Sequence, residues 1–142
     1  MNGRIDHIGI ITSDSAAAAA LYARVASLMA EPSVEHAEEG VRITFLRPTG
    51  ADPAATTIEL IEPTRADTGV ARYLEKRGEG MHHVCLEVED IVSEIGRLSS
   101  EGYEVLDREP RRGMHREKLA FIHPRSGRGV LIELYEKGSR HP

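Results

Sequence analysis

The chain repeats one pattern of histidines, helix starts and glutamates, and this repeat restricts the fold more than any other feature. His7 and His83 each stand in an apolar run that leads to an aspartate and a helix-like segment. Each copy then closes on a glutamate, Glu59 or Glu133, inside an apolar run. A repeat of this kind predicts two similar modules that share one core.

The register of the repeat follows from residue spacing. Three pairs keep one spacing: His83 − His7 = 76, Asp90 − Asp14 = 76 and Phe121 − Phe45 = 76. The glutamates differ by 133 − 59 = 74, so the first copy is two residues longer. The turn-forming stretch from Thr49 to Ala55 accommodates the extra residues. The same spacing makes His83, and not its neighbour His82, the equivalent of His7.

Chain length and composition favour one domain. A chain of 142 residues with 40% hydrophobic content can bury one core but is short for two independent domains. We therefore predict a single domain over residues 1–142, with module one at 4–63, a linker helix at 67–79 and module two at 80–137. The single cysteine, Cys85, excludes an internal disulfide, and we expect it to be a small core residue.

Charge and hydropathy limit the partners. The net charge of −5 argues against general binding of nucleic acid, which needs a basic surface. No apolar run is long enough to span a membrane, and the N-terminus enters a strand at once, so we expect neither a membrane span nor a signal peptide. These features predict a cytoplasmic protein.

Residue patterns predict the order β-α-β-β-β in each copy and hence an α+β fold. Asp14 and Asp90 offer N-cap oxygens for the two helices. The first helix is expected to include Leu28 and Met29 and to stop at Pro32. Strands are expected at 4–12, 34–36, 41–46 and 56–61, and at 84–88, 103–106, 118–122 and 129–135.

The two histidines and two glutamates are predicted to form one site. Residues two apart in a strand share a face, so Ile58 and Leu60 point toward the helix while Glu59 points away. Glu133 behaves in the same way. A carboxylate there needs a partner or a cation, and imidazole nitrogens suit a divalent transition metal. A structural salt network is the alternative that the repeat leaves open.

A basic stretch interrupts the acidic chain. It contains Arg108, Arg111, Arg112, Arg116 and Lys118. Charge alone does not distinguish a site for an anionic ligand from a solvated loop.

The duplicated pattern resembles the vicinal oxygen chelate, or glyoxalase-like, superfamily. Within it the chain resembles the methylmalonyl-CoA epimerase family over nearly its whole length. The resemblance rests on Asp6-His7-Ile8-Gly9-Ile10, Ile58 to Pro63, the specific segment Tyr73 to His83, Ala120 to Pro124 and Gly129 to Leu134.

The resemblance implies a fold, a metal and a reaction. Both modules would close around a shared curved-sheet cleft, with His7, Glu59, His83 and Glu133 as metal ligands. Some relatives have glutamine at the position of Glu59. The metal would be divalent, cobalt first, with Mn²⁺, Ni²⁺ or Zn²⁺ as alternatives. The expected reaction interconverts the C2 epimers of methylmalonyl-CoA, an acyl-CoA of propionate metabolism, and a homodimer is the implied assembly.

Epimerisation needs a proton removed from one face of C2 and returned to the other, through an enolate that a metal can stabilise. Some relatives carry a glutamate where this chain has Ile43, which cannot carry a proton. Glu133 matches the other position that supplies a base in the family, so the resemblance implies Glu133 as ligand and base. Glu59, the symmetric carboxylate of the repeat, or a metal-bound water would then act on the opposite face.

The loop from Arg112 to Arg116 is expected to border the substrate. Arg112, Gly113, His115 and Arg116 are the predicted contacts, and relatives commonly have glycine at the position of Arg116. Arginines here would suit a carboxylate or the phosphates of CoA.

Three other functions share parts of this pattern. A glyoxalase I type lyase or isomerase, acting on a thiol adduct, would use the same four ligands. An extradiol dioxygenase would use one carboxylate, which leaves Glu59 without a role. A non-catalytic ligand-binding protein of the same fold would need no metal.

Overall fold

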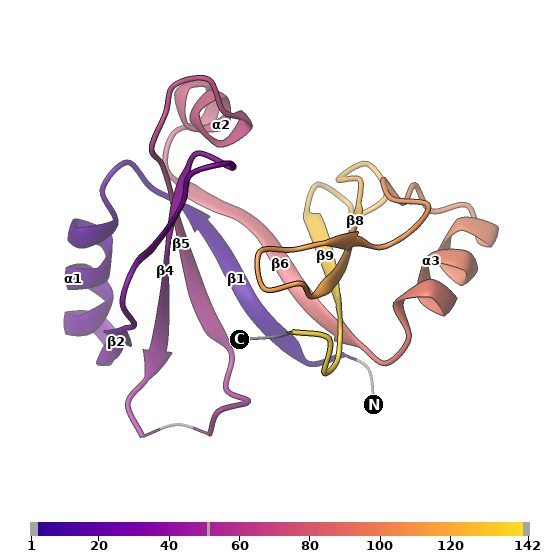
Figure 1. Cartoon of the computed structure of the whole chain (residues 1–142), viewed down its shortest axis with the longest axis horizontal. Helices are drawn as coiled ribbons and strands as arrows, with labels where there is room; N and C mark the ends of the chain where they lie inside the picture. The colour runs from indigo at the N-terminus through magenta and orange to yellow at the C-terminus, as the bar shows by residue number, and fades with distance from the viewer. Residues whose placement is uncertain (1–2, 51, 141–142) are drawn as a thin grey trace. The chain divides into compact units, whose positions relative to one another are not determined.

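The computed structural model describes residues 3–50 and 52–140 of the chain (Figure 1). Within these residues it has three helices and mixed parallel and antiparallel strand pairing, so the predicted α+β class is confirmed. The described residues form two compact bodies: residues 7–82, and the residues up to Asp6 together with those from His83 on. The division into modules 4–63, 67–79 and 80–137 stays a prediction.

The body of residues 7–82 is built on the first copy of the repeat. Its strands follow the order β2-β4-β5-β1, with β3 also paired to β4. The pair β1 and β5 is parallel, and β4 pairs antiparallel with β2, β3 and β5. The elements are β1 (Ile5–Ile11, in this body from His7 on), α1 (Ser15–Ala26), β2 (Leu28–Ala30), β3 (Val34–His36), β4 (Val41–Pro48), β5 (Thr57–Pro63) and α2 (Gly69–Arg77).

The other body repeats this plan. Its strands follow the order β6-β9-β8-β7, with a parallel pair β6 and β9 and antiparallel pairs β8–β9 and β7–β8. The elements are β6 (Gly80–Val88, in this body from His83 on), α3 (Ile91–Ser100), β7 (Arg111–Arg112), β8 (Lys118–Ile122) and β9 (Leu131–Glu136).

In each body a helix packs against the central strands. Helix α1 contacts β4 and β5, and α3 contacts β8 and β9 (Figure 1). Leu46 and Leu60 are fully buried, and Ile122 and Leu134 belong to the core cluster around α3. Since side chains alternate along a strand, Glu59 and Glu133 lie on the opposite face, as predicted.

Helix α1 ends earlier than the sequence predicts. Asp14 caps it by accepting a hydrogen bond from the Ala17 N–H at 3.0 Å, but the helix stops at Ala26. Ser27 has a left-handed φ of 55°, and Leu28–Ala30 then pair antiparallel with the end of β4. The expectation that Leu28 and Met29 belong to the helix is therefore wrong, because their backbone pairs with strand β4 instead.

The second copy departs from prediction at one strand. Asp90 caps α3 as expected, by accepting from the Ser93 N–H at 3.1 Å. The expected strand at 103–106 is reduced to one bridge, between Val105 and Ile122. The Phe121 N–H donates to the Asp107 carboxylate and the Glu104 N–H donates to the Ser126 hydroxyl, so neither extends the bridge into a ladder. The unpredicted strand β7 pairs with Lys118 and Leu119 at the start of β8. None of the helices in the described residues has the length and apolar character to cross a membrane.

The segment after α2 is tied to the end of β1 within the body of residues 7–82. Helix α2 lies where a linker helix was predicted. It ends at Arg77 and is capped by Gly78, which has a φ of 76°. The Glu79 carboxylate accepts hydrogen bonds from the Thr12 hydroxyl at 2.8 Å, the Ser13 N–H at 2.7 Å and the Ser13 hydroxyl at 2.8 Å. One side chain thus satisfies three donors at the turn that precedes α1.

Stability should depend on the charge of Glu79. The Ser13 N–H above all, then the Thr12 and Ser13 hydroxyls, lower the pKa of Glu79 in the folded protein. A depressed folded pKa contributes stability above the unfolded pKa, about 4.3, and that stability is lost as pH falls through the folded value. In urea titrations the destabilisation by Glu79→Gln should be largest near neutral pH and shrink in acid. A pH-independent difference, or an equal one for Glu75→Gln on α2, would contradict this.

Candidate metal centre

The body of residues 7–82 holds one buried histidine–glutamate pair. His7 comes from β1 and Glu59 from the neighbouring parallel strand β5, where Glu59 lies opposite Gly9. The distance from His7 Nε2 to Glu59 Oε2 is 3.4 Å, and the two side chains are 4% and 12% exposed. Because glycine has no side chain, the strand beside Glu59 leaves room for the carboxylate.

The other body holds the equivalent pair. His83 comes from β6 and Glu133 from β9, where Glu133 lies opposite the small residue Cys85. The distance from His83 Nε2 to Glu133 Oε2 is 2.9 Å, with side chains 5% and 8% exposed. Both copies therefore point the same imidazole nitrogen at a carboxylate from the adjacent parallel strand. The assignment of His7, Glu59, His83 and Glu133 as the ligands of one metal ion stays a prediction.

Each pair has the donor atoms and spacing of two metal ligands. Ligand atoms about 2.1 Å from one ion, at tetrahedral or octahedral angles, lie about 3.0–3.4 Å apart. The two measured separations, 3.4 and 2.9 Å, are close to that range. A hydrogen-bonded ion pair has similar distances, so the metal interpretation rests on the donor set, its burial and its repetition. An imidazole nitrogen and a carboxylate suit a divalent transition metal.

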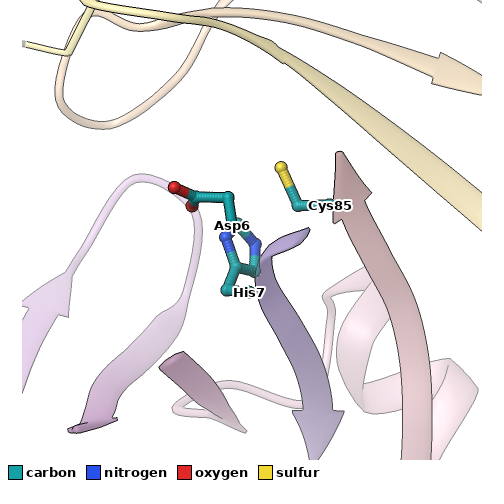
Figure 2. Close-up of side chains that lie close together, drawn as sticks. All are labelled: Asp6, His7 and Cys85. Atoms are coloured by element: carbon teal, nitrogen blue, oxygen red, sulfur yellow. The ribbon is translucent and has the colours of Figure 1, made fainter. Parts of the chain in front are cut away.

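The Asp6 carboxylate forms ion pairs with two arginines. Its carboxylate accepts from Arg4 Nη2 at 2.6 Å and from Arg140 Nη2 at 3.0 Å. Figure 2 shows Asp6, His7 as the next residue, and Cys85, whose Sγ lies within 4.8 Å of a carboxylate oxygen of Asp6. Cys85 is fully buried, so the prediction that it is a small core residue is confirmed. The two arginines already balance the Asp6 charge, which disfavours Asp6 as a metal ligand.

Strand β4 offers no acid or base near Glu59. Ile43 lies opposite Ile61 of β5, is 5% exposed and belongs to an apolar cluster with Ile11 and Val41. A proton carrier at this position would be surrounded by hydrocarbon. In the body of residues 7–82, Glu59 is therefore the carboxylate paired with the predicted ligand His7.

The predicted substrate loop is held by a residue that the sequence did not single out. The buried Glu117 accepts from the His115 N–H at 2.7 Å with its side chain and from the Gly113 N–H at 2.9 Å with its carbonyl. Arg112 donates to the Arg116 carbonyl at 3.0 Å. Arg112, Gly113, His115 and Arg116 thus belong to one tight turn. Neither the repeat nor residue spacing marks Glu117 in the sequence. Its role is visible only in the structure, as hydrogen bonds to residues two and four positions before it.

The backbone at Arg116 has a conformation that favours glycine. Arg116 has a φ of 62°, in the left-handed region that glycine adopts without strain. Arg116 therefore adopts this conformation at some conformational cost.

Gly113 should tolerate no side chain. A Cβ built there would lie 2.2 Å from Glu117 Oε1 and 2.4 Å from its Cδ. Gly113→Ala must displace the buried Glu117 carboxylate and break its bond to the His115 N–H, so we expect a loss of about 1–3 kcal/mol in the free energy of unfolding. Gly96→Ala is the control: it lies in α3 with nothing within 4 Å and should stabilise the protein. Equal denaturation midpoints for Gly113→Ala and the wild type would contradict this expectation.

Comparison with known proteins identifies the class. The family model described as the Glyoxalase/Bleomycin resistance protein/Dioxygenase superfamily matches residues 6–121. The chain belongs to this superfamily, and the resemblance drawn from its duplicated pattern is confirmed.

Individual relatives narrow the class to epimerases. The chain is 35% identical to the ethylmalonyl-CoA/methylmalonyl-CoA epimerase of Cereibacter sphaeroides, over 94% of this chain and 98% of that protein. It is 37% identical to the uncharacterized protein YqjC of Bacillus subtilis, over 97% and 96%. A solved methylmalonyl-CoA epimerase in complex with methylmalonyl-CoA and NH4+ is 34% identical, covers 100% of both chains and has a TM-score of 0.82. The chain is an enzyme, an isomerase of the epimerase class.

Proposed function

We propose that the chain interconverts the two C2 epimers of methylmalonyl-CoA, with one divalent ion held by His7, Glu59, His83 and Glu133. The observation that carries the proposal is the buried histidine–glutamate pair found once in each copy of the repeat. Similarity to an epimerase solved with methylmalonyl-CoA, over the full length of both chains, supports the substrate. The two modules would supply the shared curved-sheet cleft expected for the superfamily.

The ion would act as a Lewis acid that stabilises negative charge on the substrate oxygens. The C2 proton lies between a thioester and a carboxylate, so its removal leaves charge that spreads onto oxygen. Glu133 is the proposed base. Its side chain is 8% exposed, which keeps water from competing for the proton. Glu59 is the repeat-related carboxylate and the proposed acid–base partner for the opposite face of C2.

The remaining assignments extend the same proposal. The turn that contains Arg112, Gly113, His115 and Arg116 would contact the acyl-CoA, with the arginine side chains exposed for anion binding. Imidazole and carboxylate ligands suit a divalent transition metal. Among these metals the family resemblance favours Co²⁺, with Mn²⁺, Ni²⁺ or Zn²⁺ as alternatives. We assign the enzyme to propionate metabolism in the cytoplasm, as a homodimer.

Solvent exchange tests the proposal directly. The Co²⁺-loaded protein is incubated with one epimer of methylmalonyl-CoA in deuterium oxide and followed by proton NMR. We expect loss of the C2 proton signal together with racemisation. Turnover of the methylglyoxal–glutathione adduct with no exchange at C2 would instead support a glyoxalase I type function. Binding of ligand without turnover of either substrate would support a non-catalytic protein.

A further inference from the structure

The only two phenylalanines of the chain both stand against the predicted ligand histidines. In the body of residues 7–82, the ring centroids of His7 and Phe45 are 6.1 Å apart, with an interplanar angle of 83°. In the other body, His83 and Phe121 are 6.4 Å apart at 86°. Both contacts are edge-to-face, and the two phenylalanines keep the 76-residue spacing of the histidines.

Strand register makes each phenylalanine a neighbour of the glutamate as well. Phe45 of β4 lies opposite Glu59 of β5, and Phe121 of β8 lies opposite Glu133 of β9. Cross-strand partners share a face of the sheet. Each copy of the repeat therefore presents a set of three side chains: a histidine, a glutamate and a phenylalanine.

The two aromatic rings are supported in different ways. Phe45 packs against the apolar cluster that includes Ile43 and Ile61. Phe121 has the Arg111 guanidinium over its ring, with the carbon Cζ 5.0 Å from the centroid. Asp107 fixes this arrangement, because one carboxylate oxygen accepts from Arg111 Nε at 2.7 Å and the other accepts from the Phe121 N–H at 2.8 Å. Repetition of the histidine contact despite different supports indicates that the contact itself is the shared feature.

We propose that Phe45 and Phe121 are positioning residues that fix the ring planes of His7 and His83, so that each Nε2 stays directed at its glutamate. An edge-to-face ring restricts rotation of the imidazole about its Cβ–Cγ bond. Groups that orient a ligand imidazole tune metal affinity even though they do not touch the ion. This inference rests on the proposed metal centre and adds residues that hold the ligands in place.

Cobalt binding to the purified full-length protein tests the inference. Phe121→Leu keeps an apolar side chain but removes the flat ring, and Phe121→Tyr keeps the ring. We expect Phe121→Leu to raise the dissociation constant for Co²⁺ about 10-fold or more and to shift the visible absorption bands of bound Co²⁺. Phe121→Tyr should keep both the Co²⁺ affinity and the absorption spectrum of the wild type.

Matched controls separate positioning from general destabilisation. Ile122 is the next residue on β8, is 7% exposed and belongs to the α3 core cluster, so Ile122→Val perturbs the fold on the other face. It should lower the melting temperature without changing Co²⁺ affinity or spectrum. Phe45→Leu and Leu46→Val form the equivalent pair on β4, where Leu46 is fully buried.

Each outcome has one interpretation. Wild-type affinity and spectrum in Phe121→Leu and Phe45→Leu would overturn the inference, as would an equal loss of affinity in Ile122→Val and Leu46→Val. If the wild-type protein itself binds no Co²⁺, the proposed metal centre fails first, and the inference fails with it. Weakened Co²⁺ binding in Phe121→Leu and in Phe45→Leu, with wild-type binding in Phe121→Tyr, supports the inference.

Discussion

Replacement of Glu133 by glutamine is expected to reduce exchange of the C2 proton of methylmalonyl-CoA by about 10³-fold, within the 10²–10⁴-fold range typical of a general base. Glutamine has nearly the same shape and can still accept a hydrogen bond from His83, 2.9 Å away in the native pair. It cannot accept the proton from carbon, and it is a weaker ligand for a divalent ion. The measurement is the rate of loss of the C2 signal in deuterium oxide, at Co²⁺ concentrations that saturate each variant.

The matched control is Glu59→Gln. Glutamine keeps the size of the side chain and removes only its charge, so Glu59→Gln should retain the fold. We expect Glu59→Gln to keep metal binding and to exchange the C2 proton of one epimer, while inversion to the other epimer slows. That separation of exchange from inversion would assign Glu59 to the second face. Exchange in Glu133→Gln near the native rate would instead remove Glu133 as the base.

The repeat made most of the fold predictable, because spacing carries the register of two similar modules. The helix caps at Asp14 and Asp90 and the strand faces of Glu59 and Glu133 follow from local rules. The failures lie where tertiary pairing decides. Leu28 has a helical spacing, yet Leu28–Ala30 join β4 once Ser27 leaves the helix. The segment at 103–106 has strand-forming residues but makes only one bridge.

The candidate site was predictable only in part. The four proposed ligands can be picked out in the sequence because both residue type and spacing repeat. Phe45 and Phe121 repeat as well, but phenylalanine in a strand is ordinary core composition, so only the ring contacts suggest a role. Glu117 carries no repeat signal, and its importance to the turn at 113–116 follows from burial and two short-range hydrogen bonds.

Ile43 gains a physical explanation that the sequence alone did not supply. The resemblance implies an acid at this position, but in the structure Ile43 belongs to the cluster against which Phe45 packs. The second copy places a polar support at its own phenylalanine, Arg111 held by Asp107. The two copies thus keep the same histidine, glutamate and phenylalanine while their surroundings differ.

Metal stoichiometry should distinguish one shared ion from two separate pairs. If His7, Glu59, His83 and Glu133 bind a single ion, the chain binds one Co²⁺, and His7→Ala or His83→Ala each weakens binding by about 100-fold or more. In the double variant the two losses should not combine as independent effects, since ligands of one ion are coupled. Two independent pairs would give two Co²⁺ per chain, with one retained in each single variant.

Equilibrium dialysis with metal analysis measures both the number of ions and the dissociation constants. A second readout is thermal stability, because an ion that binds only the folded chain stabilises it by about 2.7 kcal/mol at 100 times its dissociation constant. That increment should vanish in His7→Ala and in His83→Ala alike. His123→Asn is the control, because His123 lacks a repeat-matched histidine and its Nδ1 accepts the Arg125 N–H at 2.9 Å, a bond that asparagine can replace. Loss of the increment in only one of the two histidine variants would assign the ion to a single copy of the repeat.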